Sequence, residues 1–245
     1  MGKILESLFR KAGRTYGTSK WIFKSFAGNE KEALQAEYSL GKMLSGEIIK
    51  QIGLVNDPTI ASIIQEIADR LYDHLTNKNR KFVYYILKSP EINAFALPGG
   101  FIFLTSSLLN LLKDKKDELA FVLGHEMGHV IKGHALDRMV ANTAIGIISK
   151  IGPGRGVVGG FTRKTLAKLL YSAYSQDQES EADDFGVSIM RAAGFDPHAA
   201  QSFLLQLNEL KPPKVETTIN RYLASHPPLK VRVRNIQKTI NQTSG

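Results

Sequence analysis

The residues with the clearest chemical potential form the run Gly124-His125-Glu126-Met127-Gly128-His129, which contains an HExxH pattern. On a helix, side chains four positions apart lie on the same face, so His125 and His129 can bind one metal ion together. Glu126 projects in another direction and can accept a proton from a water molecule that the metal activates. Metal-assisted hydrolysis of a peptide bond requires this combination of groups.

An ordinary amphipathic helix with two surface histidines is the alternative explanation of the pattern. The surrounding sequence favours the metal site, because apolar residues recur at helical intervals through the same segment. Asp117 and Glu118 fall in the expected first turn, where carboxylates interact favourably with the helix dipole. We therefore expect an active-site helix over residues 117–134.

A catalytic zinc site has three protein ligands and one open position, so a third ligand is expected elsewhere. His134 would point about 140° away from His129 around the same helix, which makes it a poor ligand. Glu179 and Asp183 lie in an acidic run and share a helix face, being four positions apart. Glu179 could bind the metal, while Asp183 could accept a hydrogen bond from the far nitrogen of a ligating histidine.

Clustered acids usually form a solvated helix face, and this is the other explanation of the run. Glu181 lies about 200° around the helix from Glu179 and is expected to be solvated.

Four ordered blocks of the sequence resemble a known family of zinc endopeptidases, metallopeptidase family forty-eight. The family includes the type I CAAX prenyl proteases, bacterial HtpX, and soluble periplasmic and mitochondrial Oma-like members. The matching blocks are Asn93–Gly100, Asp117–Ala120 leading into the HExxH, Glu179-x-x-Ala182-Asp183, and Ser225–Pro228.

The resemblance implies an α+β, mostly helical, zincin-like (gluzincin) fold with a small sheet above the HExxH helix. It implies one Zn²⁺ per chain and supports Glu179 over Glu181 as the ligand beside His125 and His129. We expect a zinc-dependent endopeptidase with Glu126 as general base, acting on unfolded or damaged polypeptides in protein quality control. A membrane-associated, chaperone-like factor with a resting or structural zinc site is the alternative.

His226 is the candidate for stabilising the oxyanion of the tetrahedral intermediate. It precedes two prolines, which hold the local chain extended. It could donate to the oxyanion, or it could occupy the fourth metal position in a resting state. Tyr222 and Arg232 are alternatives for the oxyanion role, and a surface histidine in a tight turn is the simpler explanation.

Three short strands are expected at residues 82–87, 93–97 and 101–104, with a Pro98-Gly99-Gly100 turn joining the last two. Proteases can bind a substrate backbone as an added strand, because main-chain hydrogen bonds accept any sequence in extended form. The candidate edge residues are Asn93, Ala94, Phe95 and Ala96, with residues 101–104 as the other possible edge. A core hairpin without a substrate role is the alternative.

Further helices are expected at residues 30–51, 58–77, 178–194 and 228–239, with another opening at Asp196. Asp57 and Pro58 fit the cap and first turn of the second of these. Residues 151–161 contain a GxGxxG by letter, but no strand precedes it, so a mobile loop is expected and nucleotide binding is not.

We expect residues 1–29 to form a basic amphipathic extension ahead of a catalytic domain over residues 30–245. This extension could contact a membrane surface peripherally. A helix that packs on its own domain or on a partner subunit is the alternative. The chain has 43% hydrophobic and 22% charged residues, as globular proteins do. Because it has no cysteine, disulfides, cysteine nucleophiles and thiolate metal sites are excluded.

The formal net charge of +9 would attract anionic lipid or nucleic acid. No nucleic-acid recognition motif accompanies it, so nucleic acid is not an expected partner. No apolar run approaches the length of a transmembrane helix, and no signal peptide is visible. We expect a soluble protein in the cytoplasm or at the periphery of a membrane, or in the periplasm if a signal has been removed.

Overall fold

The structure is a computed structural model that describes residues 30–142, 172–210, 226 and 229–242. Its helices are α3 (Glu30–Ile52), α4 (Pro58–Asp73), α5 (Ser106–Leu111), α6 (Lys116–Ile131), α7 (His134–Asn142), α9 (Gln176–Ala192), α10 (His198–Glu209) and α12 (Leu229–Gln242). Its strands are β1 (Val83–Leu87), β2 (Ala94–Leu97) and β3 (Phe101–Thr105), with the 3₁₀ turn η1 (Pro98–Gly100) between the last two.

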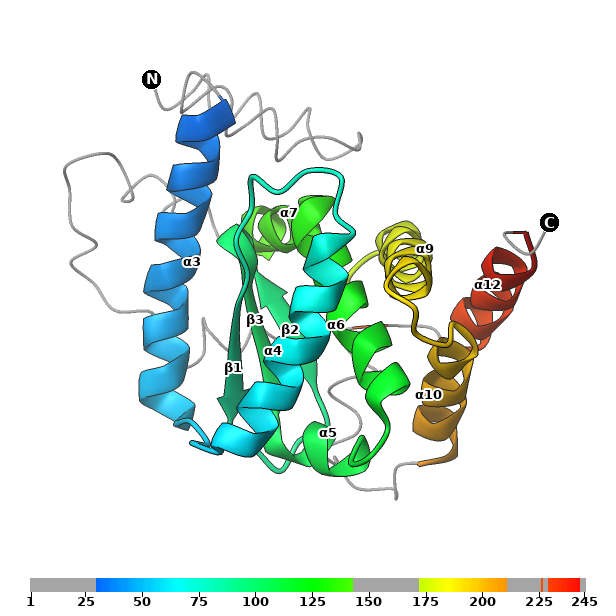
Figure 1. The fold of residues 1–245 in the computed structure, drawn as a ribbon. Coiled ribbons are helices and arrows are strands. Elements are labelled where there is room, and N and C mark those ends of the chain that lie inside the picture. Colours follow the sequence, from blue (N-terminus) through cyan, green and yellow to red (C-terminus); the bar gives the residue numbers. More distant parts are fainter. Residues whose placement is uncertain (1–29, 143–171, 211–225, 227–228, 243–245) are drawn as a thin grey trace.

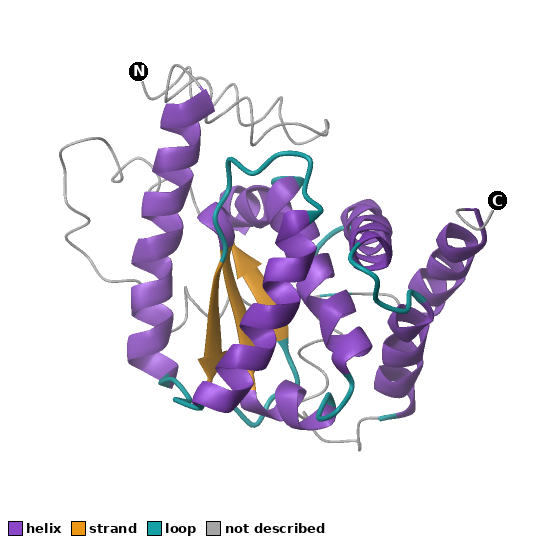
Figure 2. Cartoon of the chain, viewed as in Figure 1, coloured by secondary structure: helices purple, strands orange, loops and turns teal. Residues whose placement is uncertain are grey.

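The expected α+β, mostly helical fold with a small sheet is confirmed (Figure 1, Figure 2). Several expectations fall outside the described residues: the N-terminal extension, the glycine-rich segment 151–161, and Tyr222. In the part of the chain that the structure describes, no helix combines the length and the apolar character needed to cross a membrane.

Helix α4 begins where its sequence signal predicts. The Asp57 Oδ1 atom accepts hydrogen bonds from the backbone nitrogens of Thr59 and Ile60, both at 3.0 Å, and Pro58 occupies the first turn. The prediction that this helix reaches residue 77 is wrong, because α4 ends at Asp73. The next two backbone nitrogens bond to carbonyls three residues back, which closes the last turn.

The sheet has the strand order β1-β3-β2, with β1 parallel and β2 antiparallel to β3. The predicted hairpin of β2 and β3 is present, and Gly99 in its turn has a φ of 78°. Strand β3 is paired on both sides, so residues 101–104 cannot form an exposed edge and that alternative is wrong. Of the two strands in the hairpin, only β2 has an outer edge.

Each face of the sheet carries its own hydrophobic core, because successive strand residues point to opposite sides. Ala94, Ala96, Ile102 and Leu104 face a core that includes side chains of α4, α6, α9 and α10. Phe95, Leu97, Phe101 and Phe103 face a second core formed with α3 and α7. The sheet is therefore covered on both faces, and β2 is fixed in position next to α6.

The active-site helix is shorter than the sequence suggests. Helix α6 ends at Ile131, and Gly133 adopts a φ of 82°, a conformation that terminates helices. His134 therefore begins a separate helix, α7, rather than closing α6, and the predicted span of 117–134 is corrected to 116–131.

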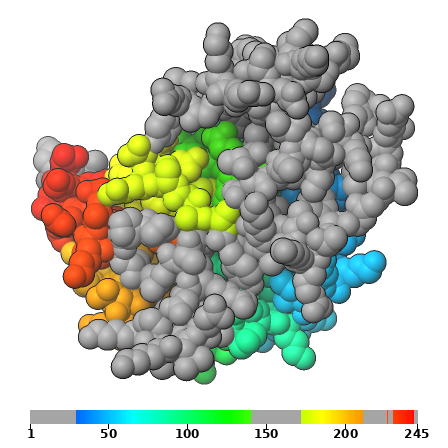
Figure 3. Space-filling view, turned by 180° about the vertical axis from the view of Figure 1, so that it is seen from behind, coloured from blue at the N-terminus to red at the C-terminus, as the bar shows by residue number. Residues whose placement is uncertain are grey.

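Helices α9, α10 and α12 lie together beside α6, on the side away from α3 (Figure 1). Seen from behind, their outer surfaces adjoin one another at one end of the molecule (Figure 3). Ser175 caps α9 through a capping box with Gln178, in which each side chain accepts a hydrogen bond from the other's backbone nitrogen.

Helix α3 packs against the η1 turn at a point where there is no room for a side chain. A Cβ atom on Gly41 would overlap the carbonyl oxygen of Pro98 and lie 2.7 Å from a ring carbon of Phe101. Nearby, Glu37 accepts a hydrogen bond from the Gly99 nitrogen at 3.0 Å, which ties the helix to the turn.

We predict that Gly41→Ala lowers the free energy of unfolding by about 1–3 kcal/mol, because it overfills this contact. Gly46→Ala in the same helix is the matched control, since a Cβ there would meet nothing within 4 Å. That variant should raise stability by about 0.5–1 kcal/mol through helix propensity. Urea denaturation of both variants measures the difference, and equal effects would contradict the close packing of α3 on η1.

Candidate metal centre

Helices α6 and α9 approach each other closely because small residues face across their contact. A Cβ atom on Gly124 would lie 3.2 Å from the Gly186 Cα, and one on Gly128 would lie 3.2 Å from the Ala182 Cα. This closeness allows the polar side chains beside these glycines on one helix to reach those on the other. In sequence, the signal is a pair of small residues four positions apart in each helix, Gly124 and Gly128 in α6 and Ala182 and Gly186 in α9.

The structure brings His125, His129, Glu179 and His226 into one cluster, whose ligand atoms all lie within 4.8 Å of one another. The Nε2 atoms of His125 and His129 are 3.1 Å apart. Glu179 reaches them from α9, with Oε1 3.3 Å from His129 Nε2 and Oε2 3.8 Å from His125 Nε2. His226 Nδ1 lies 3.5 Å from His125 Nε2 and 2.8 Å from Glu179 Oε1.

These separations fit a divalent zinc ion. Zinc binds imidazole nitrogen and carboxylate oxygen at about 2.0–2.1 Å, so the ligand atoms of a tetrahedral site lie about 3.3 Å apart. The five measured separations, from 2.8 to 3.8 Å, bracket that value. All four side chains are fully buried, so they cannot be satisfied by bulk water.

Protonation states in the cluster suit metal binding. Burial lowers the pKa of His129 well below its usual value, and an imidazole must be neutral to bind a metal. Burial by itself raises the pKa of Glu179, but His226, Arg232 and two hydrogen bonds outweigh it and hold that pKa well below its ordinary value. The cluster therefore offers a neutral His129 imidazole and an ionised Glu179 carboxylate at neutral pH.

Glu126 lies inside the same buried space. Its Oε1 atom is 3.7 Å from His226 Nε2. Neither of its carboxylate oxygens accepts a hydrogen bond from the described residues, although the side chain is fully buried. Buried carboxylates normally have partners, so this group is suited to a water molecule or a substrate.

Asp183 lies behind His125, with its Oδ1 atom 2.9 Å from the imidazole Nδ1. This is the position that the sequence suggested for it, since the Nε2 atom of the same ring faces the cluster. Burial raises the pKa of Asp183, but the charge and hydrogen bonds of Arg232, together with the contact to His125, outweigh it and keep the carboxylate ionised.

Arg232 holds three parts of the centre together, a role that the sequence did not reveal. Its guanidinium donates to both carboxylate oxygens of Asp183, at 2.7 and 2.8 Å, and lies 2.9 Å from Glu179 Oε2. It also donates to the His226 carbonyl at 3.4 Å. The sequence does not indicate these contacts, because the carboxylates that Arg232 binds lie about fifty residues away along the chain.

Tyr174 and Arg138 connect the cluster to the edge of the sheet. The Tyr174 ring stacks on His129 with centroids 3.7 Å apart, and burial raises the pKa of its hydroxyl. The Arg138 guanidinium lies 4.3 Å from the centroid of the same ring and donates to the carbonyl of Ala96 at 3.0 Å. The sequence analysis identified neither residue.

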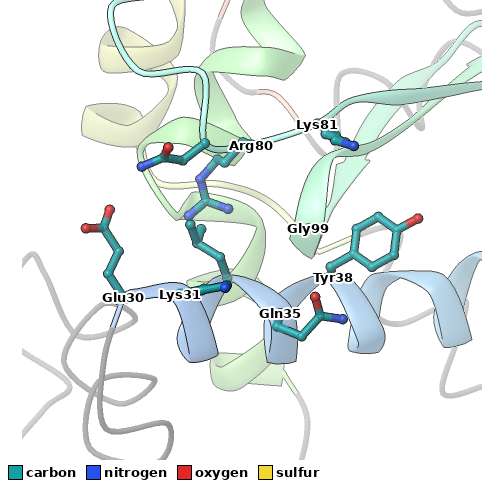
Figure 4. Close-up of a pocket in the computed structure, with 9 residues that line it drawn as sticks. Glu30, Lys31, Gln35, Tyr38, Arg80, Lys81 and Gly99 are labelled. Carbon is teal, nitrogen blue, oxygen red and sulfur yellow. The ribbon is translucent and has the colours of Figure 1, made fainter.

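A surface pocket of about 870 Å³ lies apart from this centre, between α3 and the segment preceding β1 (Figure 4). Lys31, Arg80 and Lys81 line it, so it is basic. Arg80 is already paired with the buried Glu37 at 2.7 Å. Since Glu37 also binds the η1 turn, we interpret this region as a structural junction between α3 and the sheet.

The HExxH helix, the glutamate on a second packed helix and the small sheet beside them together define a zincin-like metalloprotease fold. Comparison with known proteins agrees with that class: the sequence model of peptidase family M48 matches residues 56–240, more than half of the chain. The chain therefore belongs to peptidase family M48.

Similar proteins carry protease names. Metalloprotease LoiP of Escherichia coli (strain K12) is 32% identical over 208 residues, which cover 79% of this chain and 81% of the relative. Beta-barrel assembly-enhancing protease of Yersinia pestis is 27% identical over 226 residues, covering 86% of this chain and 45% of the relative. Mitochondrial metalloendopeptidase OMA1 of Schizosaccharomyces pombe is 30% identical over 162 residues, 64% of this chain and 46% of the relative. The matched part of this chain thus spans less than half the length of the assembly-enhancing protease and of OMA1.

We predict that Arg232→Met destabilises the metal-free protein by about 3–5 kcal/mol at neutral pH, because it leaves two buried carboxylates without their cation. The depressed pKa of Asp183 contributes stability above the carboxyl's unfolded pKa of about 3.9 and loses it as the pH falls through the folded pKa. The difference between variant and wild type should therefore shrink below about pH 4.

Urea denaturation with a chelator present, repeated from pH 7 to pH 3, measures this difference. Arg234→Met on the exposed side of the same helix is the control and should change stability by less than about 0.5 kcal/mol. A loss that is equal in the two variants, or independent of pH, would show that the buried ion pairs do not support the centre.

Proposed function

We propose that this protein is a zinc-dependent endopeptidase whose metal ion is bound by His125, His129 and Glu179. The observation that carries the proposal is the buried cluster in which these side chains and His226 gather four ligand atoms within 4.8 Å. A zinc ion bound there would polarise the carbonyl of the scissile peptide and lower the pKa of a water molecule. Family membership supports the same activity.

In this proposal Glu126 is the general base. Its carboxylate follows His125 directly in the chain and is buried beside the cluster, 3.7 Å from His226 Nε2. It accepts a proton as the water oxygen bonds to the peptide carbonyl carbon. It then returns that proton to the amide nitrogen as the carbon–nitrogen bond breaks, which releases the new amine.

His226 has two possible roles, and the distances favour one of them for the resting protein. Its Nδ1 atom is 2.8 Å from Glu179 Oε1 and 3.5 Å from His125 Nε2, so it can fill the fourth ligand position. In a complex with substrate, the same imidazole would be able to donate to the oxyanion, since its Nε2 atom lies 3.7 Å from the Oε1 atom of the proposed base Glu126. Asp183 keeps His125 in the tautomer that directs Nε2 to the metal.

The outer edge of β2 is the proposed substrate-binding strand. The hydrogen bond from Thr105 N to Asn93 O fixes which residues pair with β3, and pairing alternates along an antiparallel strand. The backbone N–H and C=O groups of Ala94 and Ala96 therefore face outward, whereas those of Asn93 and Phe95 face β3. Of the four residues proposed from the sequence, Ala94 and Ala96 would bind the substrate backbone.

A substrate recognised through its backbone must be extended but can have any sequence. Unfolded or damaged polypeptides meet that requirement, and folded proteins mostly do not. We therefore propose a role in protein quality control, with which the name of the beta-barrel assembly-enhancing proteases is compatible. Because Arg138 already donates to the Ala96 carbonyl, a bound strand would have to replace that hydrogen bond.

We predict that Glu126→Gln retains stoichiometric zinc but cleaves an unfolded protein such as casein at least about 100-fold more slowly, since it cannot accept the proton. His125→Ala should lose the zinc as well as the activity. Metal analysis and a casein assay, each with and without chelator, distinguish these outcomes. Glu118→Gln, earlier on the same helix and paired with Lys115, is the control and should remain active.

Undiminished cleavage by Glu126→Gln would remove this residue as the base. Full zinc retention by His125→Ala would refute the proposed ligands.

We also predict that methylation of the backbone nitrogens of a substrate peptide slows its cleavage at every second position. In a series of peptides of one cleavable sequence, each methylated at one nitrogen, kcat/KM should fall about three- to tenfold at alternate positions. Alternate nitrogens of an added strand face the β2 edge, while those between them face away. A loss that follows no alternation would mean that the substrate does not bind as a strand.

A further inference from the structure

His134 returns to the metal centre although the chain has left helix α6. Helix α6 ends before Gly133, which has a left-handed conformation, and the imidazole of His134 at the start of α7 lies next to that of His129. The Nδ1 atoms of the two rings are 3.1 Å apart, and His134 is only 3% exposed. The second nitrogen of His134, Nε2, lies 3.6 Å from the carboxylate of Glu181 on α9.

The arrangement of nitrogens fixes where the protons lie. His129 directs Nε2 toward His125 and Glu179, so Nε2 must be the nitrogen without a proton if it binds a metal. Its proton is then on Nδ1, and the acceptor at hydrogen-bond distance is His134 Nδ1. His134 must in turn carry its own proton on Nε2, the nitrogen that faces Glu181.

We propose that His134 is a positioning residue for the metal ligand His129, and that Glu181 orients His134. This inference rests on the metal centre proposed above. Metal-binding histidines generally donate their far N–H to a fixed acceptor, which sets the ring orientation and makes the ligand more basic. The two histidines of the HExxH thus have different supports: a buried carboxylate, Asp183, for His125, and a second imidazole for His129.

His134 does not belong to the ligand set itself. The four residues whose ligand atoms gather within 4.8 Å do not include it, and its contact is with the nitrogen of His129 that faces away from them. Glu181 is not simply solvated, as its spacing suggested, because it faces His134 while its side chain remains 41% exposed. The chain of contacts therefore runs from the buried cluster to the protein surface.

The test compares an acceptor with a non-acceptor at position 134. His134→Asn places a side-chain oxygen near the position of the lost Nδ1, whereas His134→Leu fills similar space without an acceptor. Zinc affinity is measured by competition with a chromophoric chelator, and unfolding of the zinc-free protein is followed in parallel. We expect His134→Leu to weaken zinc binding about 10–100-fold and His134→Asn to recover most of that loss.

Two further variants test the outer contact. Glu181→Gln should weaken zinc binding about two- to fivefold, as expected for a partly exposed charge. Asp177→Asn, exposed on the same helix, should leave the affinity unchanged. His198 is a further control, because its Nδ1 atom lies 2.9 Å from Asp196 Oδ1 and both side chains are exposed, away from the cluster. His198→Leu should also leave the zinc affinity unchanged.

Wild-type zinc affinity in His134→Leu would overturn the proposal. So would an equal loss in His134→Asn and His134→Leu, because it would mean that packing rather than an acceptor matters. If His134→Leu does not fold, His134→Asn and Glu181→Gln still test the proposal. A loss of zinc affinity in His134→Asn, with unchanged affinity in Glu181→Gln, would refute it. Failure of the metal centre itself gives a different result, namely zinc retention by His125→Ala.

Discussion

The backbones of α6 and α9 nearly touch at Gly124, Gly128 and Gly186, and the geometry of the metal centre depends on this contact. A Cβ atom on Gly186 would lie 3.0 Å from the backbone nitrogen of His125. Only at such a separation can imidazoles from one helix meet carboxylates from the other at hydrogen-bond distance. The glycines within the HExxH run therefore matter as much for helix packing as the polar residues do for chemistry.

Electrostatics completes what the packing begins. Two carboxylates, Glu179 and Asp183, are buried without solvent and would be costly to keep ionised on their own. One guanidinium, that of Arg232, contacts both. Together with His226 and His129 at Glu179, and with His125 at Asp183, it outweighs the effect of burial on their pKa values. The result is a cluster whose two carboxylates are ionised and held in place by the protein itself, so a metal ion that binds there would require little further ordering.

The sequence predicted the elements whose signals are local. The cap of α4 at Asp57, the β2–β3 hairpin and the pairing of histidines four residues apart could all be derived from neighbouring residues. The placement of β3 between two strands could not, because parallel pairing of β1 with β3 joins segments separated by a loop and a strand. Nothing in a local pattern specifies which strand becomes central.

Two features of the centre were missed for a related reason. The sequence predicts one helix that continues through Gly133 and directs His134 away from His129, whereas α6 ends at Ile131 and Gly133 has the left-handed conformation of a helix terminator. Arg232 was considered only for the oxyanion, since its partner Asp183 is 49 residues distant in the chain. The spacing of two residues in the sequence predicts whether their side chains meet only when both lie in the same helix.

The contribution of α12 has a consequence for how the protein is made. Arg232 is synthesised 49 residues after Asp183, and His226 comes 101 residues after His125. While the chain emerges from the ribosome, the first histidines and the acidic helix are therefore exposed to the cell without the guanidinium that neutralises them. A nascent polypeptide that stops short of α12 lacks Arg232, so the ion pairs that hold Glu179 and Asp183 cannot form until that helix has been synthesised.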